Sequence, residues 1–164
     1  MNATNELVEL QSIFDIRHGN KYDFNKMESC DPSGDAIAFV GRSGKDGGIV
    51  GFVRKHGDAA PFAPGLITVA LGGAALSSFV QARPFYTAQN IDVLKPKTAM
   101  SLDVKMYYCL CIEANRCRYS TFGREANRTL KHMLVPDLNS VPSWVSGITA
   151  KAVKSLVVDL KGII

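Results

Sequence analysis

The segment that most constrains the fold of this chain is residues 65–94, where glycine and proline cut an apolar sequence into short pieces. A pair of glycines ends the first apolar run, and Pro84 and Pro96 lie just beyond later ones. Short β-branched or alternating runs with such boundaries are typical of strands joined by tight turns. The sequence therefore predicts a strongly turned β core with strands at residues 66–71, 78–81, 85–87 and 91–94.

Further strand-like runs lie before this segment. Residues 36–40 and 49–53 flank a loop that contains four glycines, and residues 12–16 alternate ahead of a polar turn. We expect these runs to add strands to the core. We also expect a short helical stretch at residues 6–11, and a strap at residues 141–145 that pins the end of the fold.

Two helices complete the predicted fold. Ser101 is placed to cap a helix over residues 101–115, with Asp103 in its first turn, and apolar residues on several faces predict that this helix is largely buried. The sequence thus predicts an α/β (α+β) fold: a twisted, strongly curved mixed β-sheet core with a flanking helix and a C-terminal amphipathic helix. That last helix covers residues 149–160, and its apolar stripe is formed by Val153, Leu156, Val157 and Leu160.

The apolar stripe leaves two interpretations open. A coiled coil usually needs about three or more heptads, and this helix is shorter than that. The stripe either contacts another subunit or packs back on its own domain. We expect residues 1–145 to form one domain, and residues 146–164 to form a helix for packing or for a dimer or subunit contact.

The charge of the chain is uneven. Residues 1–36 carry seven acids and three bases, whereas residues 37–136 carry six acids and thirteen bases. A basic central section indicates a polyanionic partner. The length of 164 residues suits a single domain, and we find neither a secretory signal nor an apolar run of the roughly 18–20 residues that span a membrane. Four cysteines without disulfide-framework spacing favour a reduced, cytoplasmic setting.

The glycine loop at residues 41–48 carries three candidate DNA contacts, Arg42, Ser43 and Lys45. It is not a Walker A loop, because Lys45 is followed by an acid and a strand rather than by Ser/Thr and a helix. Backbone N–H groups and cations in such a loop can still approach a phosphate or a base edge. The alternative is a flexible hairpin tip.

The densest polar cluster lies at residues 116–128, where four arginines alternate with aromatic, hydroxyl and amide side chains. Arginine can pair with guanine and asparagine with adenine, while hydroxyl groups hold phosphates. The alternative is a solvated loop with one Arg–Glu pair. The candidate DNA contacts in this cluster are Arg118, Ser120, Arg124, Asn127 and Arg128.

Catalytic patterns are weak. The histidines and cysteines lack the spacing of a zinc site, and we expect no metal and no cofactor. No methyltransferase motif is present. A small Mg²⁺-dependent nuclease built from Asp92, Asp103 and Lys105 stays open as a third hypothesis, although aspartate is also common in the first turn of a helix.

The order of these elements resembles the target recognition domain of the DNA specificity subunits of type I and type IIB restriction-modification systems. The resemblance covers roughly residues 5–145. It rests on an ordered set of short motifs: IFDI with a glycine and YDF, AFVGRS before the glycine loop, GLITV with two glycines, FYTAQNIDVL, and YSTFGR.

This resemblance implies an α/β domain whose loops enter the major groove of DNA, followed by a helix that docks other subunits. Such specificity subunits are not catalytic, and they deliver separate methyltransferase and nuclease subunits to a DNA sequence. Their base-contacting residues vary with the target, so only regions can be transferred. A full specificity subunit resembles two such domains joined by two long helices. This chain is therefore expected to be a half-subunit that dimerises, a stand-alone copy, or one domain of a larger protein.

The leading hypothesis is non-catalytic recognition of a sequence in double-stranded DNA, with methyltransferase subunits as partners and a homodimer as one arrangement. The alternative is an interaction module or decoy of the same fold, which binds methyltransferase subunits without reading DNA.

Overall fold

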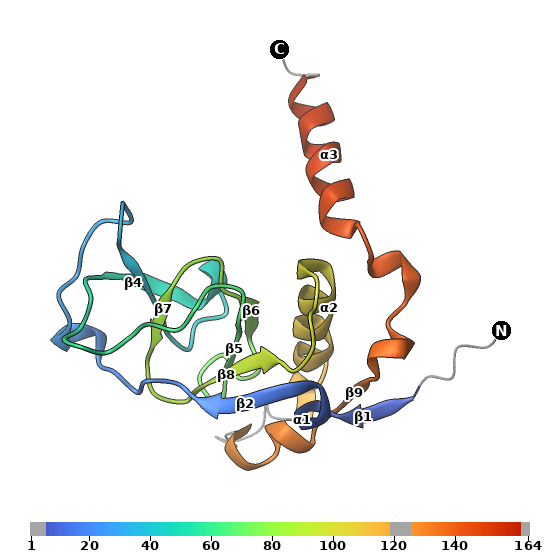
Figure 1. Ribbon diagram of the computed structural model, residues 1–164, viewed down its shortest axis with the longest axis horizontal. Helices are drawn as coiled ribbons and strands as arrows, with labels where there is room; N and C mark the ends of the chain where they lie inside the picture. The colour runs from blue at the N-terminus through green and yellow to red at the C-terminus, as the bar shows by residue number, and fades with distance from the viewer. Residues whose placement is uncertain (1–5, 119–125, 162–164) are drawn as a thin grey trace.

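The computed structural model describes residues 6–118 and 126–161, and within them the strands form three sheets (Figure 1). The four-stranded sheet is antiparallel, with the order β2-β8-β5-β6. The three-stranded sheet has the order β4-β3-β7, and its β3 and β7 are parallel. The strands are β1 (Leu7–Glu9), β2 (Phe14–His18), β3 (Ile37–Val40), β4 (Ile49–Val53), β5 (Ile67–Ala70), β6 (Ser78–Val80), β7 (Phe85–Thr87), β8 (Ile91–Pro96) and β9 (Leu134–Pro136).

The predicted mixed α/β fold class is confirmed, and every predicted strand has a counterpart among these elements. Helix α1 (Leu10–Ile13) is a single turn, whereas α2 (Leu102–Glu113) and α3 (Ile148–Lys161) correspond to the two predicted helices. The helical stretch predicted at residues 6–11 is wrong in its first half. Residues 7–9 form β1, which pairs with β9 near the other end of the chain.

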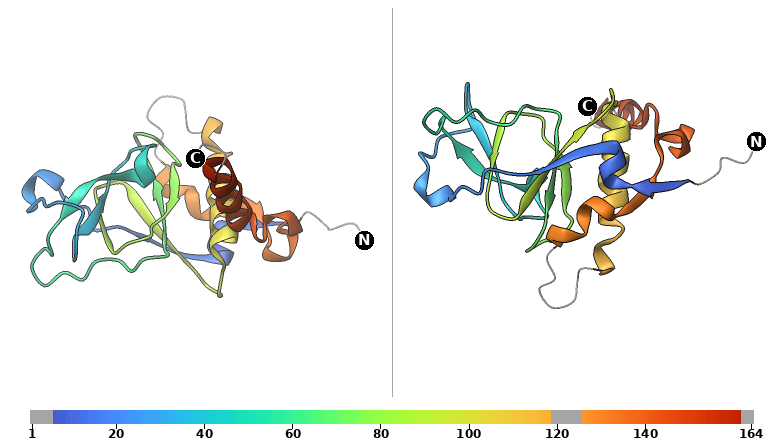
Figure 2. Two further views of the ribbon diagram at one scale, coloured as in Figure 1. Left: turned by 90° about the horizontal axis from the view of Figure 1, so that it is seen from above. Right: turned by 60° about the horizontal axis from the view of Figure 1, so that its bottom comes forward.

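The layers stack in an order that follows from the alternation of side chains along the strands. Ile67, Val69 and Leu94 point from the four-stranded sheet into the main core, against α2. Val93 points to the opposite face of that sheet and packs with Val40 from the three-stranded sheet. The three-stranded sheet, the four-stranded sheet and α2 therefore lie in succession (Figure 2).

Helix α2 buries one face and exposes another. Tyr108, Cys109 and Ile112 are buried in the main core, where burial raises the pKa of the Cys109 thiol to about 12. The prediction of a largely buried helix is wrong, because an apolar row at positions i, i+4 and i+8 is exposed to solvent. That row consists of Leu102, Met106 and Leu110.

The segment after β9 leads into α3. Val141 packs on the main core and Val145 is buried, as the predicted strap requires. Helix α3 then projects away from the sheets (Figure 1). Among the described residues, no helix has both the length and the apolar character that a membrane crossing requires.

Asp103 joins α2 to the start of α3. Its carboxylate accepts hydrogen bonds from the backbone N–H groups of Gly147 (2.7 Å) and Thr149 (3.1 Å), and from the Thr149 hydroxyl. The bond from the Thr149 hydroxyl is the main reason that the pKa of Asp103 lies below its ordinary value. Asp103 thus caps α3, whereas Ser101 caps α2 by accepting from the Val104 N–H at 3.4 Å.

The change Asp103→Ala should release the start of α3 while leaving the sheets folded, because it removes the acceptors that satisfy the first turn. Hydrogen exchange should become faster at Gly147 and Thr149, and trypsin should cut sooner after Lys151. In the unchanged protein this protection should be full above about pH 4, the ordinary range of aspartate, and fall as the pH drops through the lowered pKa of Asp103. Unchanged exchange in Asp103→Ala would contradict this role.

The turn after β2 joins the two larger sheets. Asn20 donates its backbone N–H to Thr87 Oγ1 (2.8 Å) and accepts from the Thr87 N–H (3.1 Å), at the end of β7. Gly19 lies so close that a Cβ atom at this position would overlap the Thr87 side chain. Glycine is therefore required for the approach of β2 to β7.

The change Gly19→Ala should lower the free energy of unfolding by about 1–3 kcal/mol, the usual cost of overpacking. Chemical denaturation measures this loss. Because the overlap is with Thr87, the double variant Gly19→Ala/Thr87→Ala should lose less than the sum of the two single variants. Strict additivity of the two changes would show that the clash is not the cause.

Candidate nucleic-acid interface

The glycine loop between β3 and β4 has a defined shape. Lys45 donates its backbone N–H to Ser43 Oγ at 3.1 Å, and Gly48 donates to the Lys45 carbonyl at 2.9 Å. The buried amide of Gln81 donates to the Gly47 carbonyl at 2.9 Å. Since the loop is held both internally and by Gln81, the residue after β6, it differs from the flexible hairpin tip that the sequence left open.

The glycine loop rests on the turn formed by residues 72–77, between β5 and β6. Ala74 donates its backbone N–H to the Arg42 carbonyl at 3.2 Å. The side chains of Arg42 and Lys45 remain exposed. The turn therefore fixes the base of the glycine loop, while the cations of the loop face solvent.

The basic segment after α2 contacts the same turn. The Arg116 guanidinium donates to the Ala75 carbonyl (3.1 Å) and to Ser77 Oγ (3.0 Å), and lies 3.7 Å from the carboxylate of Glu113. That carboxylate in turn accepts from the Ser78 N–H at 3.0 Å. Arg116 is thus a structural clamp between the end of α2 and the turn.

The far end of the basic segment returns to the same place. Ala126 is buried and donates its backbone N–H to the carbonyl of Leu71, the residue before the turn, at 3.0 Å. Exposed arginines flank both anchor points, Arg118 beside the first and Arg128 beside the second. We call the glycine loop, the turn at 72–77 and the anchored ends 116–118 and 126–128 the recognition edge.

The candidate residues fall into two groups with respect to the described structure. Arg42, Ser43, Lys45, Arg118 and Arg128 all lie on the recognition edge, and the four cations among them are exposed. Val153, a predicted partner contact, is exposed on α3. The remaining candidates lie outside the described residues or have side chains that are not described. These are Ser120 and Arg124 in the first case, and Asn127, Leu156, Val157 and Leu160 in the second.

The residues of the nuclease hypothesis do not converge. Asp103 caps α3, the Lys105 ammonium donates to the Gly65 carbonyl at 2.7 Å, and buried Asp92 accepts from His18 Nδ1 at 2.6 Å. Burial raises the pKa of Asp92, and the His18 bond opposes that rise. In the described part of the chain, no cluster of three or more His, Cys, Asp or Glu side chains is arranged to hold a metal ion.

Sequence reasoning missed the residues that shape the recognition edge. Gln81 and Ser77 are polar residues in an apolar stretch that follows a pair of glycines, and this position is the available signal in the sequence. Arg116 was grouped with the other arginines, because its charge alone does not distinguish a clamp from a ligand contact. The sequence likewise does not reveal that His18 and His132, which are far apart in the chain, lie on one surface.

Comparison with known proteins agrees with this architecture. The family model for the type I restriction modification DNA specificity domain matches residues 2–135. None of the curated proteins that were compared matches the chain.

Three solved structures share the fold. They are an S subunit of a type I restriction-modification system from M. genitalium (16% identity, TM-score 0.58), a chain from a study of complex assembly and conformational transition of the type I R-M system (16%, 0.65), and the HsdS subunit from Thermoanaerobacter tengcongensis (14%, 0.64). Each match covers 96% of this chain but only 39–40% of the other chain. This chain therefore spans about two fifths of the length of those subunits.

The family match covers most of the chain, including the strands of all three sheets and both anchored ends of the recognition edge. The chain belongs to the family of type I restriction modification DNA specificity domains.

Proposed function

We propose that this chain recognises a specific sequence in double-stranded DNA as the specificity component of a restriction-modification system, and that it is not itself catalytic. The observation that carries the proposal is the recognition edge, where two basic segments far apart in the sequence are fastened to one turn. Membership of the specificity-domain family supports DNA recognition over both the decoy and the nuclease hypotheses.

The chemistry of the recognition edge suits this role. Lysine and arginine contacts to phosphates supply most of the affinity, whereas side chains that reach base edges supply specificity. The glycine loop presents Arg42 and Lys45 on a fixed backbone, which suits entry into the major groove. We also assign DNA contacts to the side chains of Ser43, Arg118, Ser120, Arg124 and Asn127.

A second surface suits protein partners. Met106 and Leu110 of the exposed row of α2 line a hollow of about 200 Å³ whose other side is formed by Trp144 and the first turn of α3, including Ile148. Val153, one turn further along α3, is 60% exposed. Contiguous exposed apolar surface of this kind marks protein contacts. We propose that residues 146–164, with the exposed row of α2, bind methyltransferase subunits or a second copy of this chain.

The cellular setting follows from the same proposal. Four cysteines whose spacing does not match a disulfide framework suit a reducing compartment. We therefore place the chain in the cytoplasm, acting on duplex DNA. Residues 1–145 would form the recognition domain.

Selection of binding sites from random duplexes tests this function directly. An enriched motif with affinity that falls steeply as salt rises is the expected result. A palindromic motif would indicate a two-fold dimer. Equal binding to all sequences, or none, would contradict sequence recognition.

The change Arg42→Ala should weaken binding to the selected duplex by about 1–3 kcal/mol and relax specificity at one position, if Arg42 reads a base. Titration against the selected duplex and its single-base variants measures both effects. Arg54→Ala is the matched control, because Arg54 is exposed at the opposite end of β4. Loss of equal size in both variants would point to net charge rather than to a base contact.

The change Leu110→Asp should weaken association with methyltransferase subunits at least about tenfold, because it places a charge in an apolar contact. Sedimentation of the mixed subunits measures the association. Leu134→Asp is the control, since Leu134 on β9 is 55% exposed and lies outside the α2/α3 surface. If Leu110→Asp associates normally with methyltransferase subunits, Leu110 is not part of the contact with them.

A further inference from the structure

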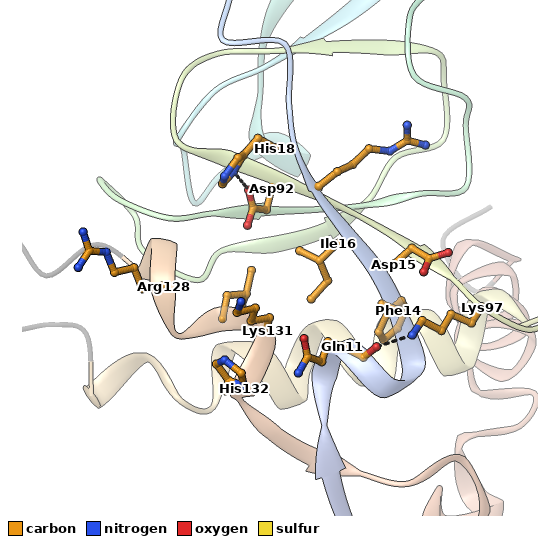
Figure 3. A pocket seen from close by; sticks show the side chains of 12 residues that line it. Gln11, Phe14, Asp15, Ile16, His18, Asp92, Lys97, Arg128, Lys131 and His132 are labelled. Carbon is orange, nitrogen blue, oxygen red and sulfur yellow. Dashed lines mark hydrogen bonds and ion pairs between the residues drawn. The ribbon is translucent and has the colours of Figure 1, made fainter.

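A groove of about 690 Å³ lies beside the recognition edge, between the sheet strands β2 and β8 and two 3-10 turns (Figure 3). The turns are η4 (Ala126–Arg128) and η5 (Leu130–His132). A smaller hollow of about 260 Å³ shares His18 and Arg128 with the groove and reaches Leu71, where the turn at 72–77 begins. The groove therefore continues from the recognition edge.

Four cations and two carboxylates, Asp15 and Asp92, line the groove, and the cations differ in how the protein holds them. The Arg17 guanidinium lies over the Phe62 ring at 5.6 Å, and the Lys97 ammonium donates to the Gln11 carbonyl at 2.7 Å. These two cations are held by the protein itself. Arg128 and Lys131 project from successive turns and are exposed.

Two histidines, His18 and His132, face the groove from opposite sides (Figure 3). Each has a carboxylate beside it. His18 Nδ1 lies 2.6 Å from Asp92 Oδ1, and His132 Nδ1 lies 3.0 Å from Glu9 Oε1. The histidine side chains are 62% and 52% exposed, so a ligand can reach them. An ionised carboxylate at Nδ1 fixes the proton there and leaves Nε2 to accept a proton or meet a ligand.

The charged groups around the two rings come from several elements. Around His18 they are Asp92 from β8, Lys21 after β2 and Arg128 from η4. Around His132 they are Glu9 from β1 and the neighbouring Lys131. Each ring therefore lies between a carboxylate and a cation.

We propose that this groove binds the sugar-phosphate backbone of double-stranded DNA, with Arg128 and Lys131 as its cationic contacts and His18 and His132 as ring contacts from either side. The proposal rests on the proposed function, because it takes duplex DNA as the ligand of the adjoining recognition edge. Contacts to phosphate carry no sequence information, so the groove sets affinity and orientation while the recognition edge selects the sequence.

The test compares the double variant Arg128→Ala/Lys131→Ala with Arg54→Ala/Lys55→Ala, which removes the same charge from exposed residues at the far end of β4. Each full chain is titrated with the selected duplex and with a duplex of scrambled sequence over a range of salt. The groove variant should lose affinity for both duplexes by the same factor, on the order of tenfold or more, and its salt slope should fall by about 2. The charge-conserving variant Arg128→Lys/Lys131→Arg should keep the slope.

An unchanged slope in the groove variant, or an equal loss in the control, would overturn the groove proposal. A wild-type chain that binds both duplexes alike would overturn sequence recognition but leave the groove standing if the groove variant is weakened. Failure of the wild-type chain to bind either duplex would overturn both.

A second readout separates the histidines from the cations. His18→Gln/His132→Gln keeps the charges of Arg128 and Lys131, so it should weaken binding to both duplexes, but by less than the groove variant does. Unchanged affinity in the glutamine variant would exclude the histidines as contacts.

Discussion

The position of the turn at residues 72–77 depends on the burial of one leucine. Leu76 has a φ of 62°, a left-handed conformation that is uncommon for a leucine, yet its side chain is fully buried in the main core. Removing that side chain from the core would cost more than the backbone gains by relaxing, since a fully buried leucine contributes about 1.5–3 kcal/mol. The core thus fixes a turn that carries the polar surface.

The described parts of the recognition edge are all attached to that turn. The glycine loop reaches it through Ala74, the end of α2 through the Arg116 clamp, and the start of η4 through the Ala126 N–H next to Leu71. The clamp keeps its own charge balanced, because the Glu113 carboxylate lies beside the guanidinium. On the recognition edge, Arg42, Lys45, Arg118 and Arg128 remain exposed and available to an external polyanion. A rigid base with charged tips suits a recognition surface, because less conformational entropy is lost on binding.

The sequence predicted the strands well and the long-range contacts poorly. Glycine and proline mark the ends of β5, β7 and β8, so their limits can be read locally. The pairing of β1 with β9 joins opposite ends of the chain, and no local window reveals it. Helix α2 was misjudged because it is apolar on two faces, one packed in the core and one exposed, and composition does not tell them apart.

The difference between local sequence patterns and long-range contacts also explains which parts of the candidate site the sequence predicts. The two basic segments stand out in the sequence by composition, but their meeting point at the turn is a tertiary fact. His18 and His132 lack metal-ligand spacing and were set aside, yet folding places both on one groove, each with its own carboxylate. Residues that meet only on a folded surface have no fixed spacing in the sequence, so a sequence pattern does not identify them. Motifs that form a single loop do have a fixed spacing.

The central claim is that one turn presents two distant basic segments to the same DNA duplex. Hydrogen exchange of the chain, measured with and without the duplex obtained by selection, tests it most directly. The account predicts that binding slows exchange together in residues 41–48, 72–77 and 116–118, with little change around Arg54 at the opposite end of β4. Slowed exchange in the glycine loop alone, or slowing centred on the opposite end of β4, would contradict it.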